Sequence, residues 1–182
     1  MSSLTLAQPR SRLTAIGILG FALVSAAASQ VAIPLPFTPV PVSLQPLIVV
    51  LAGLTLGPIA GAASMLLYLL AGALGLPVFA PVGAPGLARF FGPTGGYLIA
   101  YPAAAFVAGA LALRMRNLAG RWVAATLGIA VIFAGGIAQL TLITGSFERA
   151  LALGITPFAA LDVVKAFVAA VLSGRRSTTP RD

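Results

Sequence analysis

Cysteine and histidine are both absent from this 182-residue chain, and only three acidic residues accompany its eleven basic ones. Without cysteine, disulfides and thiolate metal sites are excluded, and without histidine the commonest general base and metal ligand is missing. We therefore expect no metal and no cofactor. Charged residues make up 8% of the chain and hydrophobic ones 59%, which leaves too few charges to cover the surface of a water-soluble domain.

Long apolar runs fill most of the sequence instead. A helix needs about 20 apolar residues to cross the hydrocarbon of a bilayer, so the chain has room for several crossings. We predict a single all-α integral membrane bundle over residues 1–182, with six transmembrane helices. The predicted spans are about 13–33, 43–56, 59–79, 94–113, 122–144 and 157–173. The second is short, and it either borrows part of the preceding proline-rich loop, 34–41, or is an imperfect span.

The basic residues indicate how such a bundle is oriented. Lys and Arg accumulate on the cytoplasmic side of membrane proteins, and six spans place eight arginines on one side and two on the other. The inner eight are Arg10, Arg12, Arg114, Arg116, Arg121, Arg175, Arg176 and Arg181, and the outer two are Arg89 and Arg149. We therefore predict both termini inside, in a bacterial cytoplasmic membrane. Because these arginines lie at the ends of apolar runs, they do not indicate a nucleic-acid partner.

The N-terminal segment has a second interpretation. Two arginines, an apolar core and the small residues 25–29 imitate a cleavable signal peptide. The apolar run continues to Ile33, however, and is long enough to span. We expect the segment to be retained as the first helix.

Small residues recur at four-residue spacing in several runs, at Gly53, Gly57 and Gly61 and again at Ala22 and Ala26. Ala105 and Gly109 repeat the pattern. Such spacing lets helix backbones approach closely inside lipid. These faces serve either internal packing or the docking of a partner's helix.

Two ionisable residues, Asp162 and Lys165, lie inside a predicted span. A charge at mid-membrane costs about 2.5 to 3.5 kcal/mol on insertion scales, so an ionisable residue there indicates a functional site. Their spacing of three puts both on one helical face, where they can neutralise each other. They form either a binding site in the outer half of the bundle or an ion pair that only lets the helix insert.

Other polar residues could complete an outward-facing site. Arg89 would bind an anionic group, unless it is an ordinary surface residue of its glycine-rich loop. Tyr97 and Tyr101, one turn apart, would supply an aromatic wall, although an interfacial aromatic belt also explains Tyr97. Gln45 and Gln139 are the amides within the spans, and Gln45 is a further candidate for substrate contact, although hydrogen bonds between helices are the interpretation we favour for both.

A set of ordered motifs resembles one known family. The motifs are FTPVPVSLQ at 37–45, LAG at 51–53, LGP at 56–58, YLLAGALGLPVF at 68–79 and GPTGGYL at 92–98. Together with Asp162 and Lys165 they are similar to the BioY family, the biotin-binding S components of energy-coupling-factor transporters. The resemblance covers about residues 13–173. The set as a whole is highly specific, whereas any one motif alone is weak.

The resemblance implies a six-helix S-component fold, high-affinity capture of biotin from outside, and a substrate site that includes Asp162 and Lys165. It implies partners as well: a transmembrane coupling protein and two ATP-binding cassette ATPase subunits. The small-residue face of the first helix, with Ala22 and Ala26, would then dock on the coupling protein. Membrane lipid surrounds such a protein, and the sequence leaves homo-oligomer formation open.

Biotin suits the site that the residues suggest. Its ureido ring offers N–H donors for Asp162 and a carbonyl for Lys165, and its carboxylate suits Arg89. The sequence has no G-x-x-x-x-G-K-[ST] phosphate loop, so ATP hydrolysis would have to come from a partner. A solitary ion-coupled carrier, with Asp162 as its titrating group, is the alternative, and transport without ATPase subunits would favour it. An enzyme is not expected, because no His, Cys or carboxylate pair is available.

Overall fold

Six helices of 12 to 27 residues form the bundle in the computed structural model, which describes residues 9–174 of the chain. Each overlaps one predicted span, although the predicted spans 13–33 and 59–79 extend beyond the ends of the first and third helices. They are α1 (Pro9–Gln30), α2 (Gln45–Leu56), α3 (Pro58–Ala73), α4 (Gly95–Arg114), α5 (Leu118–Thr144) and α7 (Ala159–Gly174). Among the described residues, α1, α4 and α5 are each long and apolar enough to cross a membrane, whereas α2 and α3 are shorter apolar helices.

Four further elements lie largely in segments that we predicted as loops, although β1 begins within the predicted first span and β2 ends at the start of the second. Strands β1 (Ala32–Leu35) and β2 (Thr38–Ser43) pair antiparallel, with Ala32 opposite Ser43. The all-α prediction therefore missed a two-stranded sheet. The prolines of this segment favoured the prediction of a loop. Both strands are edge strands, however, where a missing N–H need not break the pairing. The other two elements are the 3-10 helix η1 (Gly86–Phe91) and the short helix α6 (Phe147–Gly154), which is bent by 54° from α7.

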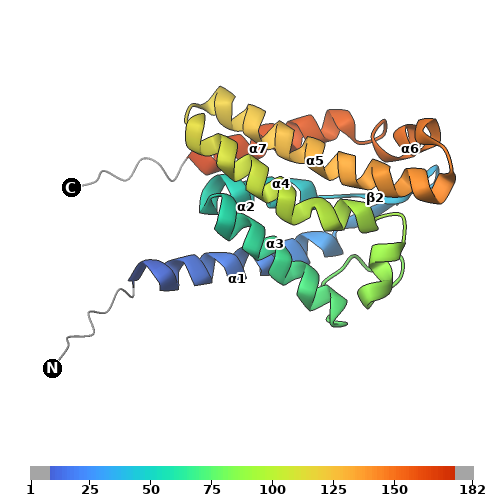
Figure 1. Ribbon diagram of the computed structural model, residues 1–182, viewed down its shortest axis with the longest axis horizontal. Coiled ribbons are helices and arrows are strands. Elements are labelled where there is room, and N and C mark those ends of the chain that lie inside the picture. Colours follow the sequence, from blue (N-terminus) through green and yellow to red (C-terminus); the bar gives the residue numbers. More distant parts are fainter. Residues whose placement is uncertain (1–8, 175–182) are drawn as a thin grey trace.

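The short helix α2 is extended by the strand that precedes it. At 1.5 Å per residue its 12 residues measure about 18 Å, too little to cross the hydrocarbon alone. Strand β2 ends at Ser43 and α2 begins at Gln45, so the two elements follow one another through the bundle (Figure 1). That the second span borrows this part of the preceding loop stays a prediction, with which the order of β2 and α2 agrees. The pairing with β1 satisfies backbone groups that could not face lipid.

Helices α2 and α4 approach each other at glycine. A Cβ at Gly53 would lie 3.0 Å from the backbone nitrogen of Gly109 and would also collide with the carbonyl of Ala105. A Cβ at Gly61 would meet Gly53 in the same way, at 2.8 Å from its Cα. These small residues therefore pack inside the bundle. Gly57, with φ at +84°, forms the turn between α2 and α3.

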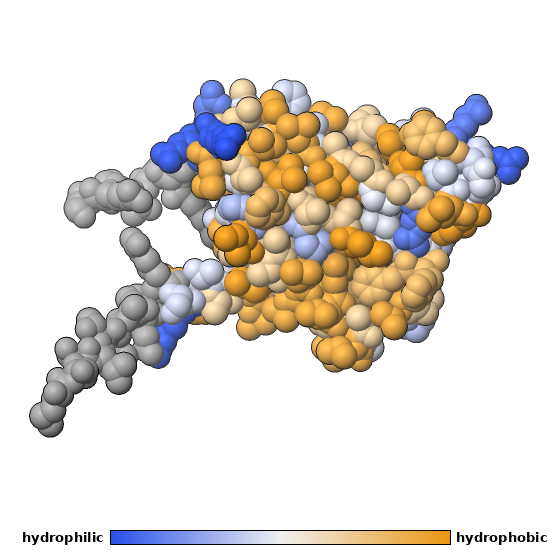
Figure 2. All heavy atoms as spheres, in the orientation of Figure 1, coloured by the Kyte–Doolittle hydropathy of each residue, from blue (hydrophilic) through white to orange (hydrophobic). Residues whose placement is uncertain are grey.

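The two ends of the molecule differ from its middle. Figure 1 shows the start of α1, the α4–α5 connection and the end of α7 at one end, with η1, α6 and the hairpin at the other. Figure 2 shows an apolar surface over the middle, with hydrophilic residues at the ends. Among the predicted inner arginines, the side chain of Arg10 and residues Arg175, Arg176 and Arg181 lie outside the described part of the chain.

Candidate functional site

A cavity opens inside the bundle where β2 meets α2. With its mouth and the open solvent there, it contains about 670 Å³ of empty space. Helices α3, α4, α5 and α7 complete its wall, together with the segment between α3 and α4. The lining residues are Val40, Pro41, Ser43, Gln45, Pro46, Tyr68, Phe79, Ala80, Arg89, Thr94, Tyr97, Leu98, Tyr101, Ile132, Phe133, Phe158, Asp162 and Lys165.

The ion pair of α7 lies in the wall of this cavity. Lys165 Nζ is 2.5 Å from Asp162 Oδ1, and the two residues are only 6% and 4% exposed. The spacing of three residues puts both side chains on one face of α7, as the sequence predicted, and both line the cavity. Asp162 lies in the first turn of α7, where the positive end of the helix dipole stabilises a carboxylate. A buried pair that faces a cavity can exchange hydrogen bonds with a polar ligand.

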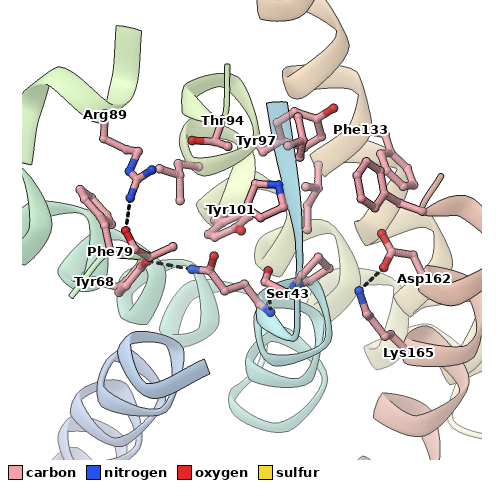
Figure 3. Close-up of a pocket in the computed structure, with 18 residues that line it drawn as sticks. Ser43, Tyr68, Phe79, Arg89, Thr94, Tyr97, Tyr101, Phe133, Asp162 and Lys165 are labelled. Carbon is pink, nitrogen blue, oxygen red and sulfur yellow. Dashed lines mark hydrogen bonds and ion pairs between the residues drawn. The ribbon is translucent and has the colours of Figure 1, made fainter. Parts of the chain in front are cut away.

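Arg89 lies across the cavity from this pair, as Figure 3 shows, with Tyr97 and Tyr101 between them. Its side chain is buried, and its guanidinium lies 6.0 Å from the centre of the Phe79 ring. Nη1 donates to the carbonyl of Val82 and Nη2 to that of Ala80, while Nε has no partner. Burial lowers the pKa of Arg89 from its ordinary value, but a guanidinium stays charged at neutral pH.

Gln45 and Tyr68 form a second polar group in the wall. Gln45 Nε2 donates to the Tyr68 hydroxyl at 2.7 Å, and the Tyr68 ring meets Phe79 edge to face, with centroids 5.5 Å apart. The expected helix-to-helix hydrogen bond of Gln45 is therefore present, and the residue also lines the cavity. Sequence reasoning missed Tyr68 and Phe79. They are the first and last residues of the 68–79 motif, which was the available signal.

The two tyrosines of α4 face inward. Tyr97 is 7% exposed and Tyr101 4%, so neither belongs to a lipid-facing aromatic belt. Tyr97 donates its hydroxyl hydrogen bond to the carbonyl of Gly154 at 3.0 Å, which ties α4 to the end of α6. Gln139 does not line the cavity. Its Nε2 donates to the carbonyls of Phe90 and Gly92, so its role between elements is structural.

The proposed docking residues of α1 lie away from the cavity. Ala22 is 7% exposed and belongs to the packed core, whereas Ala26 is half-buried at its margin. In this conformation Ala22 contacts its own bundle. A partner helix would need α1 to shift before it could reach Ala22, so docking at this face stays a prediction.

No group of three or more His, Cys, Asp or Glu residues that could hold a metal occurs in the described part of the chain. The polar groups of the cavity include hydrogen-bond donors and acceptors, and both positive and negative charges. Their arrangement suits reversible binding of a small molecule with a polar head and an apolar body.

Comparisons with known proteins agree with this geometry. The family model described as the BioY family matches residues 4–180. The biotin transporter BioY of Thermotoga maritima is 36% identical over 143 residues, 79% of this chain and 84% of that protein. The corresponding transporter of Rhizobium etli is 40% identical over 150 residues, 77% of this chain and 79% of that protein.

A solved structure shares the fold. It is a crystal structure of the S-component for biotin from an ECF-type ABC transporter, with a TM-score of 0.86 and 25% sequence identity. The match covers 99% of this chain and 96% of that one. Together with a family match over nearly the whole sequence, this shows that the chain is a multi-pass membrane protein and belongs to the BioY family.

Proposed function

We propose that this protein captures biotin in the cavity and serves as the substrate-specific component of an energy-coupling-factor transporter. The observation that carries the proposal is the buried Asp162–Lys165 pair in the wall of a cavity that is otherwise largely aromatic and apolar. The names of the relatives and of the matching structure support the substrate and the type of transporter. As a member of a transporter family the protein is not an enzyme.

Each chemical group of biotin has a suitable partner among the residues that line the cavity. At one side, Asp162 accepts hydrogen bonds from the ureido N–H groups, and Lys165 donates to the ureido carbonyl. The sulfur-containing ring packs between aromatic side chains, of which Tyr101 and Phe158 line the cavity. At the opposite side, Arg89 attracts the carboxylate with its charge and its unpartnered Nε–H.

The orientation in the membrane belongs to the same proposal. We place both termini in the cytoplasm of a bacterial cell and count six crossings, with β2 and α2 together forming the second. The end that carries the hairpin, η1 and α6 then faces outward, and the cavity collects its ligand from that side. The concentration of Arg114, Arg116 and Arg121 at the opposite end supports this orientation.

Transport against a gradient requires partners. The chain contains no phosphate loop of the usual form, so we propose a transmembrane coupling protein and two ATP-binding cassette subunits, with α1 as the docking helix. The alternative, a solitary ion-coupled carrier, would need Asp162 to exchange an ion freely. The 2.5 Å contact of Asp162 with Lys165 opposes that role, because Lys165 already neutralises the carboxylate.

Binding of labelled biotin to the purified protein tests the proposal, with two competitors that separate the parts of the ligand. Desthiobiotin keeps the ureido ring without the sulfur, whereas lipoate keeps a sulfur ring and a carboxylate chain without the ureido group. We expect desthiobiotin to compete and lipoate to fail, because a site whose polar groups are left unpaired rejects such an analogue strongly. Equal competition by lipoate would show that the Asp162–Lys165 pair does not read a ureido group.

A further inference from the structure

The segment between α3 and α4 covers one side of the cavity and is fastened at both of its ends. At its start, Ser29 Oγ donates to the carbonyl of Val78 at 2.6 Å, and Gln30 Nε2 donates to that of Phe79 at 3.1 Å. At its end, Gln139 Nε2 donates to the carbonyls of Phe90 and Gly92 at 2.8 and 2.7 Å. These bonds fix the segment to α1 and to α5. They leave its middle part, residues 80–89, to be held by other means.

The middle part is folded around Arg89. Residues 81–85 are exposed, so burial of their side chains contributes little to their position. Arg89 is 6% exposed and donates to two carbonyls of this part, those of Ala80 and Val82. The same guanidinium lies over the ring of Phe79, which forms part of the cavity wall. The Arg89 side chain therefore contacts the carbonyls of Ala80 and Val82 as well as the aromatic wall of the cavity.

Glycine at position 83 leaves room for this guanidinium. Its φ of +98° lies in the left-handed region, and a Cβ built there would stand 2.5 Å from Arg89 Nη1. A planar fork with two parallel donors can bind two carbonyls at once, whereas the single ammonium of lysine cannot reproduce that geometry. The site therefore depends on arginine for its shape as well as for its charge.

We propose that Arg89 is a positioning residue, which holds residues 80–89 closed over the cavity through the carbonyls of Ala80 and Val82, whether or not the ligand carries a carboxylate. The attraction of its charge for the biotin carboxylate is a separate contribution. The two contributions differ in one respect: only the positioning role affects ligands without a carboxylate.

A ligand comparison separates the two roles, and this part rests on the proposed function. The probe is a biotin analogue whose carboxylate is replaced by a methyl group, so that its end has neither a charge nor a hydrogen-bond acceptor for Arg89. We expect Arg89→Lys and Arg89→Gln each to weaken binding of this analogue about 10-fold, because neither side chain reproduces the planar fork that binds both carbonyls. Arg89→Gln should weaken binding of biotin further than binding of the analogue. Unchanged affinity for the analogue in both variants would overturn the proposal.

A second measurement needs no ligand and so stands even if the protein does not bind biotin. The chain has no native cysteine, and Thr94 lines the cavity, so Thr94→Cys is a probe of closure. We expect a small water-soluble thiol reagent to label this position about 10-fold faster when Arg89→Gln or Gly83→Ala is added. Labelling at the rate of the single variant would contradict a role of Arg89 in closure.

Gly75→Ala is the matched control for Gly83→Ala. Gly75 has a similar φ of +93°, but a Cβ there would meet nothing within 4 Å. Both substitutions impose the same backbone strain, and only that at Gly83 displaces Arg89. Faster labelling with Gly83→Ala alone supports the proposal, whereas equal acceleration with Gly75→Ala would attribute the effect to strain. Arg89→Lys, a milder change, gives the same comparison if Arg89→Gln does not yield monodisperse protein.

Discussion

At the scale of single residues, the free-energy cost of burying a charge explains why Asp162 and Lys165 lie in contact. Asp162 and Lys165 are the two ionisable side chains that the sequence places within a span, and the structure puts them in contact at 2.5 Å. Removing one partner of a buried pair leaves the other charge uncompensated, whereas removing both relieves that penalty. This asymmetry distinguishes a pair that binds ligand from one that only permits insertion.

We expect Asp162→Asn or Lys165→Ala alone to reduce both expression and biotin affinity, with a cost of about 3 to 5 kcal/mol from the unpaired charge. The double variant Asp162→Asn with Lys165→Gln should recover expression, because no buried charge remains. It should not recover affinity, because the ligand loses its charge-assisted hydrogen bonds. Expression, monodispersity and equilibrium biotin binding, measured for all three variants, check this. Near-native affinity in the double variant would show that the pair is structural.

At the scale of elements, close backbone approach decides how the helices pack. Inside lipid no hydrophobic force drives helices together, so they associate where small residues let them meet. The sequence pattern at Gly53, Gly61 and Gly109 left open whether these faces pack internally or receive a partner. The structure shows internal packing of α2 against α4 and α3. For Ala22 and Ala26 the docking interpretation is still a prediction.

Gly53→Ala should destabilise the bundle by about 1 to 3 kcal/mol, the usual cost of overpacking, because the new methyl group would meet the backbone of α4 at Ala105 and Gly109. Gly20→Ala in α1 is the control, since a Cβ there meets nothing within 4 Å. It should be neutral or slightly stabilising. Thermal unfolding of both purified variants in the same detergent measures the difference. Equal stability of the two would mean that α2 and α4 do not pack this closely.

At the scale of the whole molecule, the distribution of charge sets the orientation. The α4–α5 connection carries Arg114, Arg116 and Arg121 at one end, and the segment with Arg89 lies at the other (Figure 1). The positive-inside rule assigns the first end to the cytoplasm. Under this proposed orientation, the cavity would be accessible from outside.

Single cysteines test the orientation directly, because the chain has none of its own. We expect Ala84→Cys and Arg149→Cys to react with an impermeant thiol reagent on intact cells, and Arg116→Cys to react only after permeabilisation. All three positions are exposed, so a failure to react cannot be attributed to burial within the chain. Labelling of Arg116→Cys from outside would reverse the proposed topology.

The sequence by itself determined the membrane class, six helical segments and the pairing of Asp162 with Lys165. Each of these depends on local quantities: the length of an apolar run, a break at Gly or Pro, or a spacing of three along one helix. The family resemblance also came from ordered local motifs. A helix end needs only its own residues and their immediate neighbours, so such features can be read along the chain.

Only the tertiary structure decided which distant residues share the cavity. Gln45 donates to Tyr68 across 23 positions, and the segment 32–43 forms a hairpin because its two strands pair with each other. Prolines gave that segment the local signature of a loop, while the backbone pairing that overrides it depends on the surrounding helices. Arg89, too, faces the cavity because hydrogen bonds from α1 and α5 hold both ends of its segment there. Charge and spacing can nominate a site residue, but packing decides what its side chain touches.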